Sequence, residues 1–175
     1  MILWVKAIGS VLLVAAFSLA GYVVADNYSR RPKELRDLLT ALQMLETEIM
    51  YGAVPLPDAL YHIAQFSKGS VRDLFAGVRA MLLSGQGRTA GEAWQISLET
   101  IFPASSLSDT DQAILAGFGG SLGISDREDQ VKHINLAREQ LKREEAIATE
   151  DSLRCVRLWK SLGLLAGLAV CLAVI

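Results

Sequence analysis

The sequence predicts an all-α protein, in which a cytoplasmic bundle of about six helices lies between an N-terminal and a C-terminal transmembrane helix. Three observations support this class. First, no stretch alternates apolar and polar residues in the way a half-buried strand would. Second, Ser or Thr is followed three residues later by Asp or Glu at four nearly evenly spaced positions, and this pattern is typical of helix starts. Third, the apolar content is concentrated at the two ends of the chain.

The apolar ends are candidate membrane anchors. Residues 7–25 form a run of 19 residues without charge, which is long enough to cross a bilayer, and we assign residues 1–27 to an N-terminal anchor. Residues 158–175 form a shorter C-terminal transmembrane helix, with Trp159 and Lys160 at the headgroup boundary. A cleaved signal peptide at the N-terminus is the alternative. The uncleaved anchor is favoured, because the core of a signal peptide has only about 7–15 residues.

Basic residues fix the expected orientation. The positive-inside rule places the side richer in Lys and Arg in the cytoplasm. On the far side of the two apolar segments the positive charges are only Lys6 and the terminal amine. Seven basic residues instead border the middle of the chain: Arg30, Arg31, Lys33, Arg36, Arg154, Arg157 and Lys160. Residues 28–157 are therefore predicted to form a cytoplasmic domain, with Arg30 and Arg31 at the first membrane boundary.

The domain is predicted to begin with a leucine-rich helix. Pro32 suits a first helical turn and Gly52 can end the helix. Its apolar residues recur at spacings of three and four: Leu35, Leu38, Leu39, Leu42, Leu45 and Ile49. After a tight link, Pro57 opens a short second helix that turns inward Leu60, Ile63 and Ala64.

Four predicted capping boxes start the remaining helices. In such a box the hydroxyl accepts from an early helical N–H, and the acidic residue reaches back to the cap's own N–H. The pairs are Ser70 with Asp73, Thr89 with Glu92, Ser108 with Asp111, and Ser125 with Glu128. The third helix ends at Gly85–Gly87, the fourth is broken by Pro103, and the fifth is loosened by its glycines. Their inward residues are Val71, Leu74, Phe75, Val78 and Leu82; Ala93, Trp94, Leu98 and Ile101; and Ile114, Leu115, Phe118 and Leu122.

The last helix is predicted to be the longest. Residues 126–157 contain neither Gly nor Pro and are rich in strong helix formers, so the helix runs for about 30 residues into the apolar tail. One narrow apolar seam follows this helix: Val131, Ile134, Ala137, Leu141 and Ala148. A seam of this kind needs a packing partner.

No catalytic chemistry is indicated. His62 and His133 have no ligand-spaced partner, and a surface pair of His133 with Asp129 explains the second. Zinc, phosphate-loop and nucleophile-elbow motifs are absent, so we predict no catalytic, cofactor-binding or metal-binding residue. A net charge of −2 argues against nucleic acid as a partner. Trp94 at helical spacing is expected in the core, with an interface anchor as the alternative.

The sequence resembles the stage III sporulation protein AB family of endospore-forming bacteria. The resemblance covers essentially the whole chain, and its most specific block is GISDREDQ at residues 123–130. The other blocks are Arg31-Pro32, LQMLETEIMYG at 42–52, LPDAL at 56–60, GEAW at 91–94, KREEA at 142–146 and LGLLAG at 162–167. From these blocks we take Trp94, Asp126, Arg127 and Gln130 as candidate interface residues.

The resemblance implies a function that periodicity does not. Members of the family are similar to the cytoplasmic domain of the F-type platform protein of type II secretion. They act in the mother-cell membrane around the forespore, within a channel complex encoded together with a secretion-type ATPase. Expected partners are therefore the membrane, that ATPase and other proteins of the same sporulation complex. Secretion platforms duplicate the helical domain, so a single-domain chain also implies a possible homo-oligomer. A secreted helical binding protein, cleaved from its signal and tethered by its tail, is the alternative.

Overall fold

The computed structural model describes the backbone of residues 29–52, 54–123 and 126–174, and their side chains as far as Cys155. The described residues form helices and turns without any strand. The chain divides into two compact units, one of residues Lys33–Ala146 and the other of Met1–Pro32 with Ile147–Ile175. The first of these, called the helical domain below, contains most of the described side chains.

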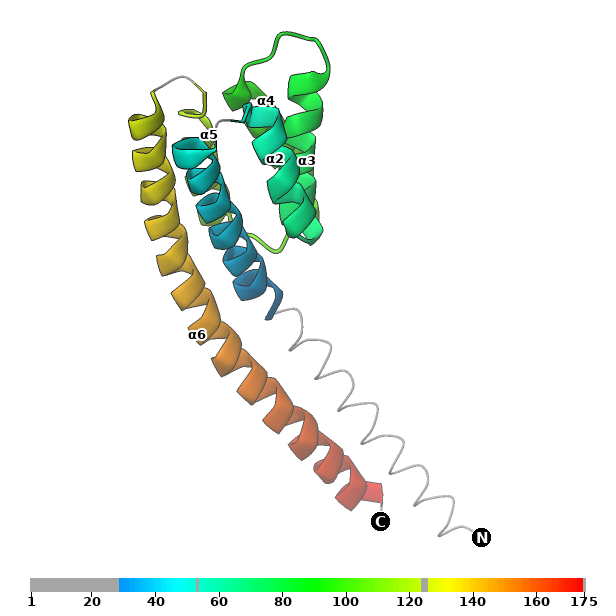
Figure 1. Ribbon diagram of the computed structural model, residues 1–175. Coiled ribbons are helices and arrows are strands. Elements are labelled where there is room, and N and C mark those ends of the chain that lie inside the picture. The colour runs from blue at the N-terminus through cyan, green and yellow to red at the C-terminus, as the bar shows by residue number, and fades with distance from the viewer. Residues whose placement is uncertain (1–28, 53, 124–125, 175) are drawn as a thin grey trace. The chain divides into compact units, whose positions relative to one another are not determined.

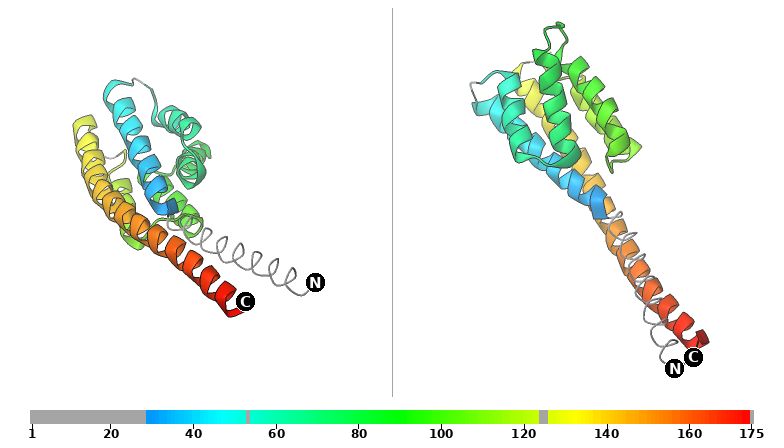
Figure 2. Two further views of the ribbon diagram at one scale, coloured as in Figure 1. Left: turned by 90° about the horizontal axis from the view of Figure 1, so that it is seen from below. Right: turned by 90° about the vertical axis from the view of Figure 1, so that its right-hand side faces the viewer.

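Six α-helices make up the described part of the chain, which confirms the predicted all-α class. The first helix is described from residue 29 to residue 51. The later elements, labelled in Figure 1, are α2 (Leu56–Phe66), α3 (Gly69–Leu83), α4 (Ala90–Ile101), the 3₁₀ turn η1 (Phe102–Ala104), α5 (Asp109–Gly119) and α6 (Arg127–Val174). In the helical domain the first helix runs antiparallel to α2 and to α6 (Figures 1 and 2).

The core of the helical domain follows the predicted apolar faces. Its largest fully buried side chains include Trp94, Phe75, Leu35, Leu38, Leu42, Leu45, Leu60, Ile63, Leu98, Leu115, Leu122 and Ile134. The α6 seam is buried at Ile134, Ala137, Leu141 and Ala148, whereas Val131 is only half-buried. Ile114 was predicted to point inward but is only half-buried, and it lines a surface groove.

Trp94 organises the aromatic centre of this core. Its indole meets the rings of Phe75 and Phe118 edge-on, with centroid separations of 5.5 and 5.0 Å. Such edge-to-face pairs are favoured by the quadrupoles of the rings. The indole N–H donates to the Leu115 carbonyl at 2.8 Å, so the one polar atom of the side chain is satisfied. Trp94 is 0% exposed, as expected for a core residue.

Two of the predicted capping boxes are confirmed. Thr89 and Glu92 bond reciprocally at the start of α4, and Ser108 and Asp111 do so at the start of α5. Each box satisfies two N–H groups that lack helical partners.

The box predicted at Ser70 is wrong. Lys68 is the N-cap of α3 and makes no side-chain cap bond, while the Ser70 hydroxyl donates to the Glu34 carboxylate on the first helix. Because α3 begins at Gly69, Ser70 is already inside the helix and cannot be its N-cap. Ser125 lies outside the described residues. At the start of α6, Asp126 Oδ1 accepts the Asp129 N–H at 2.9 Å.

The first helix does not begin at Pro32. Residues 29–31 are already helical, so the proline lies within the helix, and it is buried. Proline in a helix removes one backbone hydrogen bond. Pro32 is also the last residue before the helical domain begins.

Two membrane predictions fall largely outside the described part of the chain. The N-terminal anchor, residues 1–27, is not described, and of the C-terminal segment, residues 158–175, only a helical backbone is described, as far as Val174. Within the residues that the structure describes, no helix combines the length and the hydropathy that a membrane crossing requires.

Candidate interaction surfaces

Polar contacts join the first helix to α6. Glu46 accepts from Arg138 Nη1 at 2.5 Å and from Asn135 Nδ2 at 3.0 Å. About three turns away, Arg36 Nε donates to Glu145 Oε1 at 2.7 Å. Because position 36 meets 145 while position 46 meets 135 and 138, the two helices are antiparallel along this whole stretch. The pair therefore ties together the beginning and the end of the helical domain.

A polar cleft of about 330 Å³ lies between these contacts. Its walls carry both charges: Leu39, Thr40, Gln43, Asn135, Arg138, Glu139, Lys142 and Glu145. Carboxylates and basic groups alternate along it, so the cleft offers no net field to select an anion or a cation. We assign it to the packing of the two helices.

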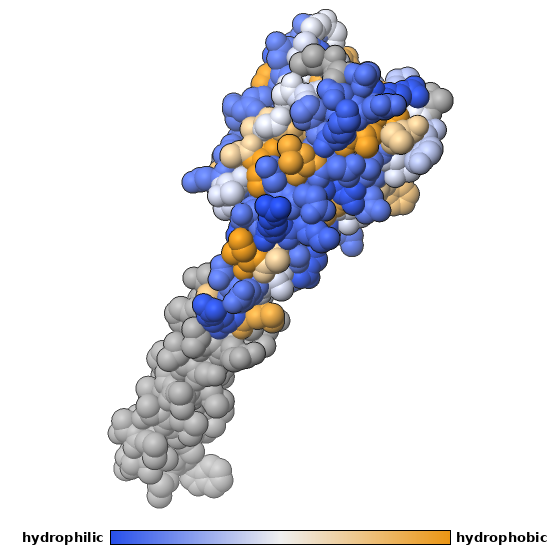
Figure 3. Space-filling model, turned by 90° about the vertical axis from the view of Figure 1, so that its left-hand side faces the viewer, coloured by the Kyte–Doolittle hydropathy of each residue, from blue (hydrophilic) through white to orange (hydrophobic). Residues whose placement is uncertain are grey.

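A second groove, of about 430 Å³, lies between α5 and α6. It is lined by Thr110, Ala113, Ile114, Gly117, Phe118, His133, Leu136, Ala137 and Gln140. Leu136 at its edge is exposed, and a Cβ placed on Gly117 would meet nothing within 4 Å. The space-filling view in Figure 3 shows apolar patches among mainly hydrophilic side chains on one face of the molecule. Such a groove is an unfilled apolar surface rather than a chemical site.

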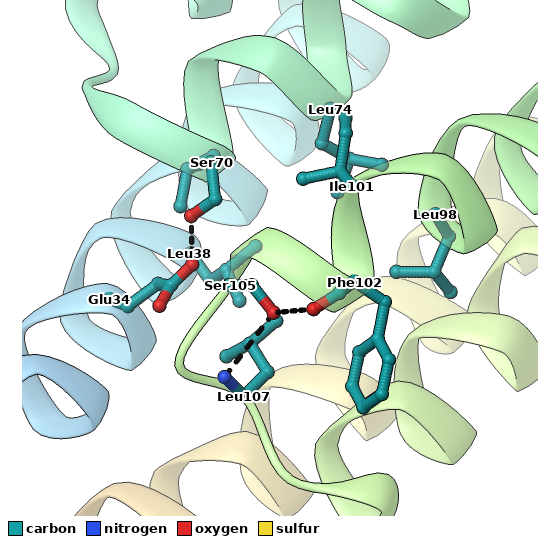
Figure 4. Close-up of a pocket in the computed structure, with 10 residues that line it drawn as sticks. Glu34, Leu38, Ser70, Leu74, Leu98, Ile101, Phe102, Ser105 and Leu107 are labelled. Atoms are coloured by element: carbon teal, nitrogen blue, oxygen red, sulfur yellow. Dashed lines mark hydrogen bonds between the residues drawn. The ribbon is translucent and has the colours of Figure 1, made fainter.

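Glu34 connects three segments of the helical domain, and Figure 4 shows its contact with Ser70. One carboxylate oxygen accepts the Ser106 N–H at 2.7 Å, and the other accepts the Ser70 hydroxyl. Burial raises the pKa of Glu34, the bonds from Ser106 act in the opposite direction, and the negative charges of Asp111 and Asp37 raise it further. The cavity beside it, about 10 Å³, is no larger than one water needs. Glu34 is therefore a structural link between helices.

Exposed apolar side chains gather at the end of the domain where α2 and α6 begin. Tyr51, at the end of the first helix, is 82% exposed. Met50, Val54 and Leu83 are also exposed there. No motif in the sequence predicts this cluster; the one signal for it is that residues 50–57 carry no charge.

The structure brings three of the four predicted interface residues together. Asp126 and Arg127 are exposed and Gln130 is half-buried, all at the beginning of α6. Trp94 does not join them, because its indole is enclosed in the core and no partner can reach it. For the other three residues, an interface role stays a prediction.

The remaining predicted residues lie elsewhere. Arg30 is exposed and Arg31 half-buried, and both have interaction partners, while the side chains of Trp159 and Lys160 lie outside the description. The histidines form surface contacts: His62 Nδ1 lies 3.4 Å from Glu48 Oε1, and His133 Nε2 lies 4.0 Å from Asp129 Oδ2. Among the described residues, no group of three or more His, Cys, Asp or Glu side chains could hold a metal ion.

Three comparisons agree on what the chain is similar to. The family model described as Stage III sporulation protein AB matches residues 6–175. The Stage III sporulation protein AB of Bacillus subtilis (strain 168) is 40% identical over 167 residues, which cover 95% of this chain and 97% of that protein.

The likeness extends to three dimensions. A solved structure of Stage III sporulation protein AB (SpoIIIAB) superimposes with a TM-score of 0.67 at 40% identity. The superposition covers 71% of this chain and 97% of that structure. The family model spans nearly the whole chain, and the relative is well above the identity at which fold and family are shared. The chain therefore belongs to the stage III sporulation protein AB family.

Proposed function

We propose that the chain is a non-enzymatic membrane platform of a sporulation channel or secretion-like complex between mother cell and forespore. In this role it couples a secretion-type ATPase to a transenvelope assembly. Family membership supports the part in sporulation. The platform role is more specific than the part in sporulation that family membership supports. It assigns no catalytic residue, cofactor or metal to the chain.

The observation that carries the proposal is the continuity of α6. This helix runs without a break for 48 residues, from Arg127 to Val174. Its first part is bound to the first helix by Glu46 with Arg138 and by Arg36 with Glu145. A platform has to pass position or force from a soluble partner to its anchor, and an unbroken helix is a stiffer connection than a flexible linker. The apolar residues that close the sequence lie at the far end of the same helix.

Membrane attachment is part of the proposal. Residues 1–27 and 158–175 would anchor the chain in the mother-cell membrane around the forespore, and the basic residues bordering the domain favour its cytoplasmic placement. The other expected partners are proteins of the same sporulation complex and further copies of the chain.

The proposal is tested by binding and by topology. Full-length chain in detergent micelles is titrated with the purified ATPase encoded together with it, in the presence of ATP, of ADP and of neither. We expect saturable binding in at least one of these states. For topology, Gly87, in the exposed α3–α4 turn, is replaced by cysteine in a background lacking Cys155 and Cys171.

An impermeant thiol reagent added outside intact sporangia should then leave Gly87→Cys unlabelled until the cells are permeabilised. Two results contradict the proposal. One is the absence of ATPase binding in every nucleotide state. The other is labelling from outside, which favours the secreted alternative.

A further inference from the structure

Helix termini build one end of the helical domain, among them those of the first helix, α2, α3 and α6. The first helix ends there at residue 51, α2 and α6 begin there, and α3 ends there, as Figures 1 and 2 show. Contacts set the register of these helices: Glu46 binds Asn135 on α6, and Glu48 lies 3.4 Å from His62 on α2. Position 51 therefore lies one helical turn beyond the last of these contacts, at the rim of the domain.

This end carries a cluster of exposed apolar side chains, which we call the Tyr51 surface. It consists of Met50, Tyr51, Val54 and Leu83. An exposed group of large apolar side chains marks a binding site more often than scattered single ones do. Tyr is also among the residues that dominate binding energy, since it presents a large rigid area at low conformational-entropy cost.

Carboxylates prevail around the Tyr51 surface. Asp58 and Glu92, in the first turns of α2 and α4, are exposed, as are Asp126 and Glu128 at the start of α6. Arg127 and Lys132 are the exposed basic residues of the same turns of α6, and the half-buried Arg88 precedes α4. A partner complementary to this end therefore presents an apolar pocket with basic side chains at its border.

The opposite end of the domain differs. Phe66, at the end of α2, is 77% exposed, and Ile147, one residue beyond the domain on α6, is 51% exposed. The contact between Arg36 and Glu145 also lies toward that end, so both chain connections of the domain leave from it. The Tyr51 surface lies at the other end, where the chain neither enters nor leaves the helical domain.

We propose that the Tyr51 surface is where the chain docks its protein partner, with Tyr51 as the central anchor and the surrounding carboxylates facing basic groups. This inference rests on the proposed function, in which that partner is the secretion-type ATPase. It adds which surface meets the ATPase and what chemistry the opposing surface must have. The interface predicted at Asp126, Arg127 and Gln130 becomes its polar rim.

The test compares two exposed aromatic residues at opposite ends. Purified full-length chain in detergent micelles is titrated with the purified ATPase, using the wild type, Tyr51→Ala and Phe66→Ala. Both side chains are mostly in solvent, so both variants should keep the wild-type circular dichroism spectrum and melting temperature. We expect Tyr51→Ala to weaken binding by about tenfold or more, as hot-spot truncations do, and Phe66→Ala to change it less than about twofold.

The charges are tested separately. Replacing Asp126 and Glu128 by Asn and Gln should slow association and reduce its dependence on salt, because rim charges act mainly on the on-rate. Unchanged affinity in Tyr51→Ala, or an equal loss in Phe66→Ala, would overturn the assignment while leaving the platform role intact.

Two further outcomes also count against it. If wild-type chain binds no ATPase, the proposed function itself fails. If Tyr51→Ala changes the sedimentation of the chain alone and leaves ATPase affinity unaltered, the surface joins copies of the chain instead.

Discussion

Gly119 lies directly against the indole of Trp94. A Cβ built on Gly119 would stand 2.1 Å from Trp94 Cδ1, well inside van der Waals contact. The same crossing of α4 and α5 is tight at Gly91, where a Cβ would lie 2.9 Å from the Gly119 carbonyl oxygen. The absence of side chains at these two positions lets the helices approach closely enough for the indole to reach the Leu115 carbonyl.

Gly119→Ala should therefore destabilise the helical domain. The indole is enclosed between Phe75 and Phe118 and cannot move aside without disturbing both rings. Overpacking of this kind costs about 1–3 kcal/mol of unfolding free energy, sometimes more. The measurement is thermal unfolding of the full-length chain in detergent, followed by circular dichroism.

The matched control is Gly117→Ala on the same helix, where the new Cβ meets nothing within 4 Å. Alanine is the better helix former, by up to about 1 kcal/mol, so this variant should melt at or above the wild-type temperature. Equal melting temperatures for the two variants would contradict the packing described at Gly119.

Thr89→Ala should remove a real helix cap. The Thr89 hydroxyl accepts the Glu92 N–H at 3.2 Å, and its loss leaves an N–H of the first turn without a partner, at about 1 kcal/mol. Thr100→Ala, on the exposed side of the same helix, is the control. The Thr100 hydroxyl only donates to the Ile96 carbonyl, so alanine there should be neutral or slightly stabilising. Chemical denaturation of both variants checks the difference, and a loss at Thr100 as large as at Thr89 would refute it.

Glu46→Gln should weaken the link between the first helix and α6. The carboxylate and Arg138 are mostly buried, and Glu46 also accepts from Asn135. Hydrogen bonds to charged groups contribute about 1.5–3 kcal/mol, so a loss in this range is expected. Glu150→Gln breaks an exposed pair with Arg154 on one helix and should change stability by less than about 0.5 kcal/mol. Denaturant unfolding at low and high salt distinguishes them, and similar losses in both variants would speak against a structural link at Glu46.

The stability of the wild type relative to its variant Glu34→Gln should be greater at acid pH than at neutral pH. Burial raises the pKa of Glu34 in the folded protein above its ordinary value of 4.5, so the folded state binds the proton more tightly than the unfolded state. The stability gained from this proton is fully present below about 4.5 and is lost as the pH rises through the folded pKa. Glutamine keeps an acceptor for Ser106 and cannot ionise.

The free energy of unfolding of Glu34→Gln, minus that of the wild type, should therefore increase as the pH rises from below 4.5 toward neutrality. Subtracting the two proteins removes the titration of groups that they share, including Asp37 and Asp111, which face Glu34. A difference that stays constant with pH would show that Glu34 titrates alike in the folded and unfolded states.

Ala146→Pro tests whether the continuity of α6 matters for function. Ala146 is exposed within the helix, and proline there removes a backbone bond and clashes with the preceding turn, at about 3 kcal/mol or more. We expect this variant to reach the membrane and to fail in a sporulation complementation assay, while Ala146→Glu, which keeps the helix, complements. The variant must first show wild-type helical circular dichroism. Normal sporulation with a folded Ala146→Pro chain would exclude a stiff connection and leave a passive scaffold.

The sequence predicted the elements that depend on local chemistry. The spacing of Leu35, Leu38, Leu42 and Leu45 identifies the buried face of the first helix, since a helical period decides which side chains share a face. The box at Thr89 formed as predicted, but the same motif at Ser70 did not. The difference is that α3 already begins at Gly69, so Ser70 lies inside the helix, where its hydroxyl contacts Glu34, a residue distant in sequence and close in space.

Contacts of that kind could not be predicted. No pattern near Gly119 indicates that it faces Trp94, and no pattern shows that Tyr51 lies outside the core while Ile49, two residues earlier on the same helix, is half-buried. Each depends on how helices cross, which a single sequence does not encode locally.

The contact between Arg36 and Glu145 has a practical consequence. Only a few residues from each of these positions, the chain enters the helical domain at Lys33 and leaves it at Ala146. Domains whose ends lie close together can be inserted into a host protein without stretching either chain. Residues 33–146 are therefore suited to domain insertion. Placed in a surface loop of an unrelated soluble carrier, they could present Tyr51 at the end of the domain away from the insertion points.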